Sequence, residues 1–118
     1  MARALVVEDD PAVARICVQL LARSGLDALV AATGQEALDH LADASEPIAF
    51  AYIDIGLPDM SGLEVVAQAR TLRPGMPVLI ATGNIEDVPA MGCPVLRKPF
   101  TLEQFRDAVE QCIGRSRP

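Results

Sequence analysis

Five side chains of this sequence could together carry out phosphate chemistry. The acids Glu8, Asp9 and Asp54 each stand at the end of a short apolar run. Thr82 and Lys98 follow two further runs of the same kind, and Lys98 is the single lysine of the chain. A carboxylate can attack phosphorus to give an acyl phosphate, while a hydroxyl and an ammonium hold the charge on the phosphate oxygens. We therefore predict that Asp54 is a nucleophile for phosphate.

The three acids also predict a cation. Carboxylates that are crowded together repel one another, so they require a cation or a raised pKa. A hard divalent ion that prefers oxygen ligands and leaves a position for a phosphate oxygen is Mg²⁺. Hydrolysis by a Ser-His-Asp arrangement is disfavoured, because the only histidine, His40, lies within a predicted helix with no serine partner in sight.

These side chains can meet only if the apolar runs form one parallel sheet. The predicted strands cover residues 4–7, 27–32, 49–53, 77–81 and 94–97. Because the strands are apolar on both faces and alternate with helical patterns, they predict a sheet covered by helices on each side. Right-handed crossovers then bring the carboxyl ends of the strands to one edge, where chemistry collects in open α/β sheets. Only the second strand contributes no reactive side chain there.

The intervening helices have recognisable starts. Asp10 as N-cap with Pro11 at the first helical position predicts the first helix, which ends at Ser24 and Gly25. Capping boxes predict the starts of three further helices, and they lie at residues 33–36, 61–64 and 101–104.

The ends and buried faces of the later helices follow from the same patterns. The helix after residue 33 is predicted to end at Glu46 and Pro47, and the helix after residue 61 near Leu72. Residues 85–93 contain Pro89 and Gly92, so they can form a turn or so of helix at most. The last helix is predicted to bury four apolar side chains: Leu102, Phe105, Val109 and Ile113.

The composition bounds the class of protein. A chain of 118 residues predicts one domain over 1–118 that is long enough to bury a hydrophobic core. Because aromatic residues make up only 3%, that core must be mainly aliphatic. A net charge of −6 argues against a nucleic-acid or anionic-membrane surface. Acids stand at residues 8–10, where a signal peptide would be apolar, and no run reaches the length of a membrane span. Three cysteines without a CxxC fit reduced thiols, so a cytoplasmic location is expected.

The chain resembles the receiver domain of bacterial two-component response regulators over nearly its whole length. The motifs that carry this resemblance are VVEDDP at 6–11, DIGLPDMSG at 54–62, ATG at 81–83 and KPF at 98–100. Each motif is weak alone, but their order and their positions at strand ends make the set specific. The resemblance implies a flavodoxin-like αβα fold in three layers, with five parallel strands in the order 2-1-3-4-5.

The resemblance also implies a role for each site residue. Asp54 would be the phosphoacceptor, and Mg²⁺ would be held by Glu8, Asp9, Asp54 and the backbone carbonyl of Gly56. Thr82 would contact the phosphoryl group and switch position, and Lys98 would pair with the phosphoryl group. The peptide bond between Lys98 and Pro99 would be cis. The phosphoryl donor would be a histidine kinase or a histidine phosphotransfer protein. The only chemistry expected of the domain itself is its own phosphorylation and dephosphorylation.

The sequence departs from the family pattern on the surface that receivers commonly use for output. Val95 stands where the family has an aromatic residue, and residues 83–97 leave room only for a shortened fourth helix. A short segment after ATGN is similar to that of some stand-alone alphaproteobacterial receivers. Asn84, beside the reactive edge, is expected to influence the lifetime of the phosphoryl group. Output would then be partner binding or service as a phosphate sink.

Two alternatives from other classes remain open at this point. A receiver that binds partners without phosphorylation would fit Val95 and the short fourth helix. A Mg²⁺-dependent aspartyl-phosphate phosphatase of the haloacid-dehalogenase type would also use acids, a threonine and a lysine. Its nucleophile, however, lies in a D-x-D motif after the first strand, and this sequence has no such motif there.

Overall fold

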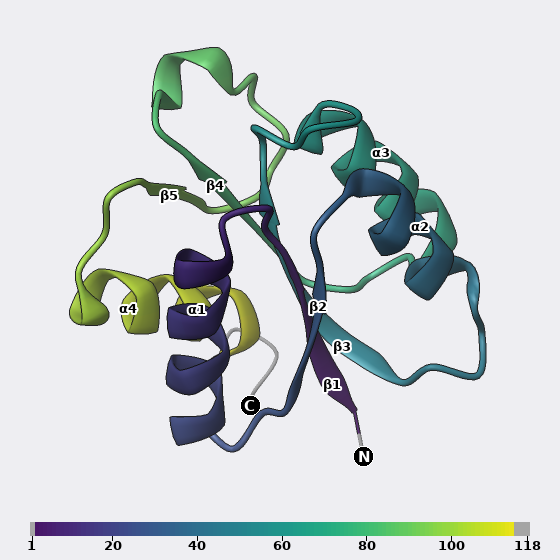
Figure 1. Ribbon diagram of the computed structural model, residues 1–118, viewed down its shortest axis with the longest axis horizontal. Helices are drawn as coiled ribbons and strands as arrows, with labels where there is room; N and C mark the ends of the chain where they lie inside the picture. The colour runs from purple at the N-terminus through teal and green to yellow at the C-terminus, as the bar shows by residue number, and fades with distance from the viewer. Residues whose placement is uncertain (1, 115–118) are drawn as a thin grey trace.

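A parallel sheet of five strands forms the centre of the computed structural model, which describes residues 2–114 (Figure 1). The strands are β1 Arg3–Val7, β2 Ala28–Ala31, β3 Ile48–Asp54, β4 Val78–Thr82 and β5 Val95–Arg97. Their order is β2-β1-β3-β4-β5, as predicted. The order reverses direction between β1 and β3, and ligands of open α/β sheets bind beside such a switch point.

Helices cover both faces of this sheet. They are α1 Pro11–Arg23, α2 Gly34–Ala42, α3 Gly62–Leu72 and α4 Leu102–Ile113, and a 3₁₀ turn, η1, covers Ile85–Asp87. Figure 1 shows α1 and α4 on one side of the sheet and α2 and α3 on the other. The three-layer prediction is therefore confirmed, and the shortened fourth helix is the single turn η1. Within residues 2–114, no helix is both long enough and apolar enough to cross a membrane.

Each face of the sheet has its own hydrophobic core. The core under α1 and α4 contains Phe50, Tyr52 and Phe105, and Phe100 packs against it. The core under α2 and α3 is built from aliphatic residues, with methionines packed at its margin. All four aromatic residues of the chain therefore lie on the α1 and α4 face.

The predicted helix starts are confirmed, but only one of the three capping boxes is complete. The Asp10 carboxylate accepts the backbone N–H of Ala12 at 2.9 Å, with Pro11 in the first turn. Thr101 and Gln104 form the full reciprocal box. Thr33 accepts an N–H from the third helical position, whereas Ser61 accepts one from the second. The side chain of an N-cap residue can satisfy either donor, so all of these helices still begin at the predicted place.

The predicted end of α2 is wrong by several residues. The helix ends at Ala42, well before Glu46 and Pro47. Arg73 at the end of α3 donates to the carbonyl of Leu41 at 2.9 Å and to that of Asp43 at 2.7 Å. An arginine from a neighbouring helix thus donates to carbonyls at the end of α2.

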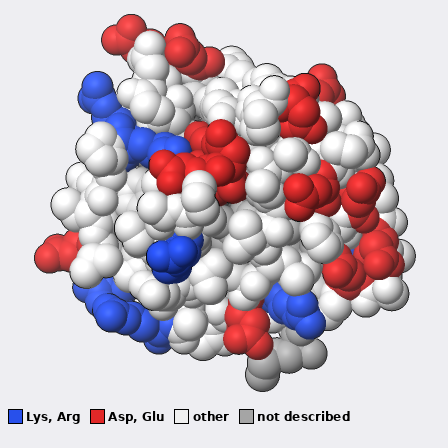
Figure 2. All heavy atoms as spheres, in the orientation of Figure 1, with Lys and Arg blue, Asp and Glu red and all other residues white. Residues whose placement is uncertain are grey.

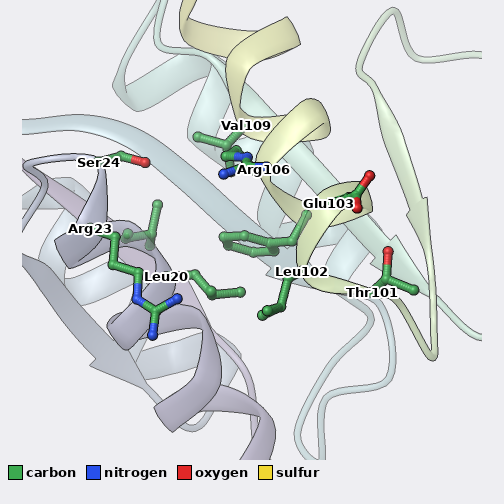
Figure 3. A pocket seen from close by; sticks show the side chains of 10 residues that line it. Leu20, Arg23, Ser24, Thr101, Leu102, Glu103, Arg106 and Val109 are labelled. Atoms are coloured by element: carbon green, nitrogen blue, oxygen red, sulfur yellow. The ribbon is translucent and has the colours of Figure 1, made fainter.

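The prediction that Leu102 is buried is also wrong. Phe105 and Val109 are buried as expected, but Leu102 in the first turn of α4 is 56% exposed. It lines a groove of about 530 Å³ between α1 and α4. In Figure 3, Leu20 of α1 and Leu102 extend toward each other across this groove.

Candidate functional site

Three acids meet at the carboxyl ends of β1 and β3. Glu8, Asp9 and Asp54 each offer a carboxylate oxygen, and these oxygens all lie within 4.8 Å of one another. Glu8 and Asp54 are buried, at 1% and 6% exposure, whereas Asp9 is exposed. Figure 2 shows a group of acidic atoms, with basic atoms beside it, at the end of the sheet that β1 reaches. Strands that are neighbours in the sheet thus bring residues far apart in sequence into one acidic cluster.

Lys98 reaches this cluster from the end of β5. Its Nζ atom lies 3.0 Å from Glu8 Oε1 and 3.3 Å from Asp54 Oδ2. Burial lowers the pKa of Lys98, but the hydrogen bond to Glu8 and the charge of Asp54 outweigh it and raise the pKa above its usual value. Its backbone N–H donates to the Thr82 carbonyl at 2.8 Å, and the bond to Pro99 is cis. The ammonium is therefore charged and fixed between two acids.

Glu8 is the most enclosed acid of the site. Its Oε1 accepts the Tyr52 hydroxyl at 3.0 Å in addition to Lys98, and its Oε2 accepts the backbone N–H of Asp10 at 3.2 Å. Burial raises the pKa of Glu8, and the neighbouring charge of Asp54 adds to this increase. Burial likewise raises the pKa of the Tyr52 phenol, so its hydroxyl stays protonated and acts as a donor.

The hydroxyl of Thr82 lies at the same edge but has its partners in the following loop. It accepts the backbone N–H of Asn84 at 3.0 Å and donates to the Asn84 carbonyl at 3.1 Å. The Asn84 side chain in turn accepts the N–H of Glu86 at the start of η1. The structure therefore places Thr82 and Asn84 together, and a contact between Thr82 and a phosphoryl group would require these bonds to rearrange.

The loop after β3 folds closely against Asp54. The N–H of Gly56 lies 3.4 Å from Asp54 Oδ1, and Gly56 forms an isolated bridge with Ser61. A side chain at Gly62 would collide with the backbone carbonyl of Asp54. Gly62 is thus required for this tight return of the chain, a role that its position in a capping box did not reveal.

Val95 lies away from the acids. It pairs with Ile80 in the register of β4 and β5 and packs against the core under α2 and α3. The side chains of Glu8, Asp54 and Lys98 contact one another instead. Val95 therefore lies on the opposite face of the sheet from Tyr52, whose hydroxyl contacts Glu8.

Sequence reasoning did not assign roles to two residues that support this region. Tyr52 shares a strand face with Asp54, and this alternation was the one signal for its contact with Glu8. Asp59 lies in the loop after Asp54, and its carboxylate accepts the N–H groups of Gly34 at 2.8 Å and Gln35 at 3.0 Å. Asp59 thus connects the loop after Asp54 to the first turn of α2.

The donor set fits Mg²⁺. All three side-chain donors are carboxylates, which are the hard oxygen ligands that Mg²⁺ takes in proteins. A cation among them would offset the repulsion between Glu8 and Asp54 that contributes to the raised pKa of Glu8. Because Asp9 is exposed, the cluster opens to solvent on one side, and Mg²⁺ usually keeps several of its waters.

The family model described as the response regulator receiver domain matches residues 4–110. This chain belongs to the receiver domain family. Relatives include the probable transcriptional regulatory protein TcrX of Mycobacterium tuberculosis, 34% identical over 85% of this chain, and the response regulator MprA of Mycobacterium avium, 32% identical over 98%. The aligned regions cover 44% and 53% of those two proteins, so this chain spans about half of their length.

Solved receiver structures agree with the fold. A CheY-like receiver domain protein from Methanospirillum hungatei has a TM-score of 0.85 at 28% identity, covering 98% of this chain and 95% of its own. The receiver domain of the hybrid histidine kinase CckA has a TM-score of 0.82 at 28% identity, covering 95% and 99%. TrrA of Thermotoga maritima, solved in complex with Mg²⁺ and BeF, has a TM-score of 0.83 at 25% identity, covering 96% and 100%. Receiver domains are signalling modules of two-component systems.

Proposed function

We propose that this receiver domain accepts a phosphoryl group on Asp54 in a Mg²⁺-dependent reaction. The observation that carries the proposal is the position of Lys98, whose ammonium bridges Glu8 and Asp54 inside the acidic cluster. A partly buried ammonium held beside a carboxylate nucleophile provides a fixed charge for the oxygens of an incoming phosphoryl group. The remaining acids, Glu8 and Asp9, would then bind the cation.

The reaction is the transfer of a phosphoryl group from nitrogen to oxygen. A carboxylate oxygen of Asp54 forms a bond to phosphorus while the bond to the imidazole nitrogen of a donor phosphohistidine breaks. The imidazole leaves, and an acyl phosphate remains on Asp54. Lys98 stays within reach of the new phosphoryl oxygens because its Nζ already lies 3.3 Å from the Asp54 carboxylate. After rearrangement of the loop at Asn84, Thr82 would donate its hydroxyl to the same group.

Mg²⁺ would be held by the carboxylates of Glu8, Asp9 and Asp54 and by the backbone carbonyl of Gly56. When bound, it supplies positive charge for the phosphoryl oxygens and screens the acids from one another. The Mg²⁺ and BeF complex of the related TrrA supports this assignment.

The partner that fits this chemistry is a histidine kinase or a histidine phosphotransfer protein. The similarity to the receiver domain of the hybrid kinase CckA supports a donor of this kind. Such a donor implies a cytoplasmic location. The phosphorylated domain would signal by binding a further protein or would act as a phosphate sink. The net charge of −6 gives no support for a nucleic-acid partner.

The direct test is phosphorylation in vitro. The protein is incubated with Mg²⁺ and acetyl phosphate, and its intact mass is compared with that of Asp54→Asn. We expect a gain of one phosphoryl group on the wild type only. If the wild type showed no adduct and no Mg²⁺-dependent binding of beryllofluoride, the proposal would be wrong, and a phosphorylation-independent interaction module would replace it. Rapid turnover of a phosphorylated metabolite would instead indicate an enzyme.

A further inference from the structure

Tyr52 is a buried phenol whose hydroxyl has no part in the chemistry described so far. It lies in the interior of β3 with 0% exposure, and its hydroxyl donates to Glu8 Oε1 at 3.0 Å. Most of the buried residues of β1, β3 and β4 are aliphatic. A phenylalanine or leucine would fill this core without the need for a polar partner, so the hydroxyl calls for a specific explanation.

The ring of Tyr52 is fixed by two other aromatic rings. Phe100 packs edge-on to it, with ring centroids 6.5 Å apart, and Phe105 packs at a tilt, with centroids 6.1 Å apart. The rings of Phe100 and Phe105 stack on each other at 5.5 Å. This packing limits the rotation of the Tyr52 ring and so defines the position of its hydroxyl.

The hydroxyl in turn limits the freedom of the Glu8 carboxylate. The terminal torsion of a glutamate is broad, so the carboxylate takes the orientation that its donors impose. Oε1 accepts both Tyr52 and Lys98, while Oε2 accepts the backbone N–H of Asp10. Without the phenol, Oε1 would keep Lys98 as its one hydrogen-bond donor within residues 2–114, and the two side chains could move together.

We propose that Tyr52 is a positioning residue for the metal site, whose hydroxyl fixes the Glu8 carboxylate, and through it Lys98, in the orientation that binds Mg²⁺ beside Asp54. The inference rests on the proposed function, because it assigns Glu8 to the cation. Groups that orient metal ligands by hydrogen bonds tune affinity without touching the ion. Tyr52 does this from within the core, where water cannot substitute for it.

The decisive variant is Tyr52→Phe, which removes the hydroxyl and keeps the ring. The Mg²⁺ affinity is measured from the shifts of the Asp9 and Gly56 amides in NMR titrations. We expect the affinity of Tyr52→Phe to fall roughly 10- to 100-fold, the range usual for groups that orient ligands. Val65→Ala is the matched control, because it destabilises the core on the opposite face of the sheet and should leave the affinity unchanged.

The outcomes separate this inference from the proposed function. If the wild type binds Mg²⁺ and Tyr52→Phe binds it equally well, the phenol only satisfies a buried hydrogen bond and the inference is wrong, while the proposed function stands. If the wild type binds no Mg²⁺, both are wrong. Glu8→Gln keeps a side chain of the same shape, and we expect Tyr52→Phe to weaken binding little further in that background.

A spectroscopic measurement covers the case in which Tyr52→Phe does not fold. Tyr52 is the only tyrosine and the chain has no tryptophan, so its near-ultraviolet absorbance and its fluorescence report on this one hydroxyl. Adding Mg²⁺ to the wild type should change both signals as the Glu8 carboxylate takes up the cation. Spectra that stay constant while the Asp9 amide shifts would contradict the inference.

Discussion

The two faces of the sheet are built for different tasks. The face under α1 and α4 holds every aromatic ring of the chain and the buried acids, and the face under α2 and α3 is packed with aliphatic side chains. Along β3 the two kinds alternate, because Tyr52 points to the first face and Ile53 to the second. On the face under α1 and α4, the Tyr52 hydroxyl can therefore contact Glu8 at the sheet edge while the rings of Phe100 and Phe105 pack against Tyr52.

The two faces also differ in whether they carry the aromatic residue that the family has at position 95. Position 95 lies on the aliphatic face, where Val95 packs with Ile80 and its neighbours. The ring that does contact the site, that of Tyr52, lies on the other face and packs against Phe100. In this chain the aromatic link to the acidic cluster runs under α1 and α4.

The largest effect on the rate of phosphorylation is expected from a substitution at Lys98. Lys98→Met removes the ammonium from the acids, and we expect adduct formation from acetyl phosphate to slow roughly 10²- to 10³-fold, as when one electrostatic donor is removed from an active site. The rate is followed by intact mass. Arg97→Met removes the same charge from the exposed neighbouring residue and should keep the wild-type rate. Similar losses in both variants would mean that net charge, and not the position of Lys98, governs the reaction.

A large deletion on the aliphatic face should lower stability and spare the chemistry. Leu41→Ala removes a side chain of α2 that is 1% exposed, so we expect the free energy of unfolding to fall by about 2–5 kcal/mol. Denaturant titration measures this loss, and Leu72→Ala, at a site 40% exposed, should lose much less. At a temperature where Leu41→Ala is still folded, its phosphorylation rate should match the wild type. A rate that fell with stability would show that the two faces are coupled.

On the side of α2 and α3, the contribution of Asp59 to stability should depend on pH. The N–H groups of Gly34 and Gln35 hold the pKa of Asp59 below its usual value, so its carboxylate stabilises the fold at neutral pH. This stabilisation is complete above the unfolded pKa of about 3.9 and is lost as the pH falls through the lower folded pKa. The Tm of Asp59→Asn should therefore lie below that of the wild type at pH 7 and converge with it in acid.

The control for this pH effect is Asp107→Asn, which neutralises an exposed carboxylate of α4. Its Tm should follow the wild type over the same range. If the Tm difference between the wild type and Asp59→Asn stayed constant down to the lowest pH, the two backbone hydrogen bonds would not be its cause.

The smallest effect is expected at Val95. Val95→Tyr restores the ring that the family usually has, on the face away from the acids. Because Val95 shares no partner with Asp54 or Lys98, the phosphorylation rate should change by less than about two-fold. Intact mass measures the rate. A lost adduct would mean that position 95 takes part in the chemistry and that the separation of the two faces is incomplete.

Local signals in the sequence were enough for the strands, the helix starts and the placement of the reactive side chains at strand ends. Asp10 and Pro11 define the start of α1 by contacts within a few residues, and each reactive side chain follows directly from a strand end. The end of α2 was missed because its carbonyls are satisfied by Arg73, which is 30 residues or more away in the chain. The hydrogen bond from Tyr52 to Glu8 spans 44 residues and was beyond local patterns for the same reason.

Helical periodicity also gave one misleading signal. Leu102 has the right spacing to share a buried stripe with Phe105 and Val109, but it lies in the first turn, where α4 extends past the core. Whether a side chain is buried at a helix end depends on the neighbouring helix, and α1 leaves a groove there. Periodicity defines a face of a helix and not how far along the helix that face is covered.

The shortness of β5 has a consequence for the behaviour of the protein at high concentration. A strand at the edge of a sheet exposes unpaired backbone groups, which can template the addition of a strand from another molecule. Here β5 is only three residues long and is bounded by Pro94 and Pro99, neither of which has an N–H to donate. The short connection that leaves no room for a full fourth helix thus ends in an edge that resists aggregation.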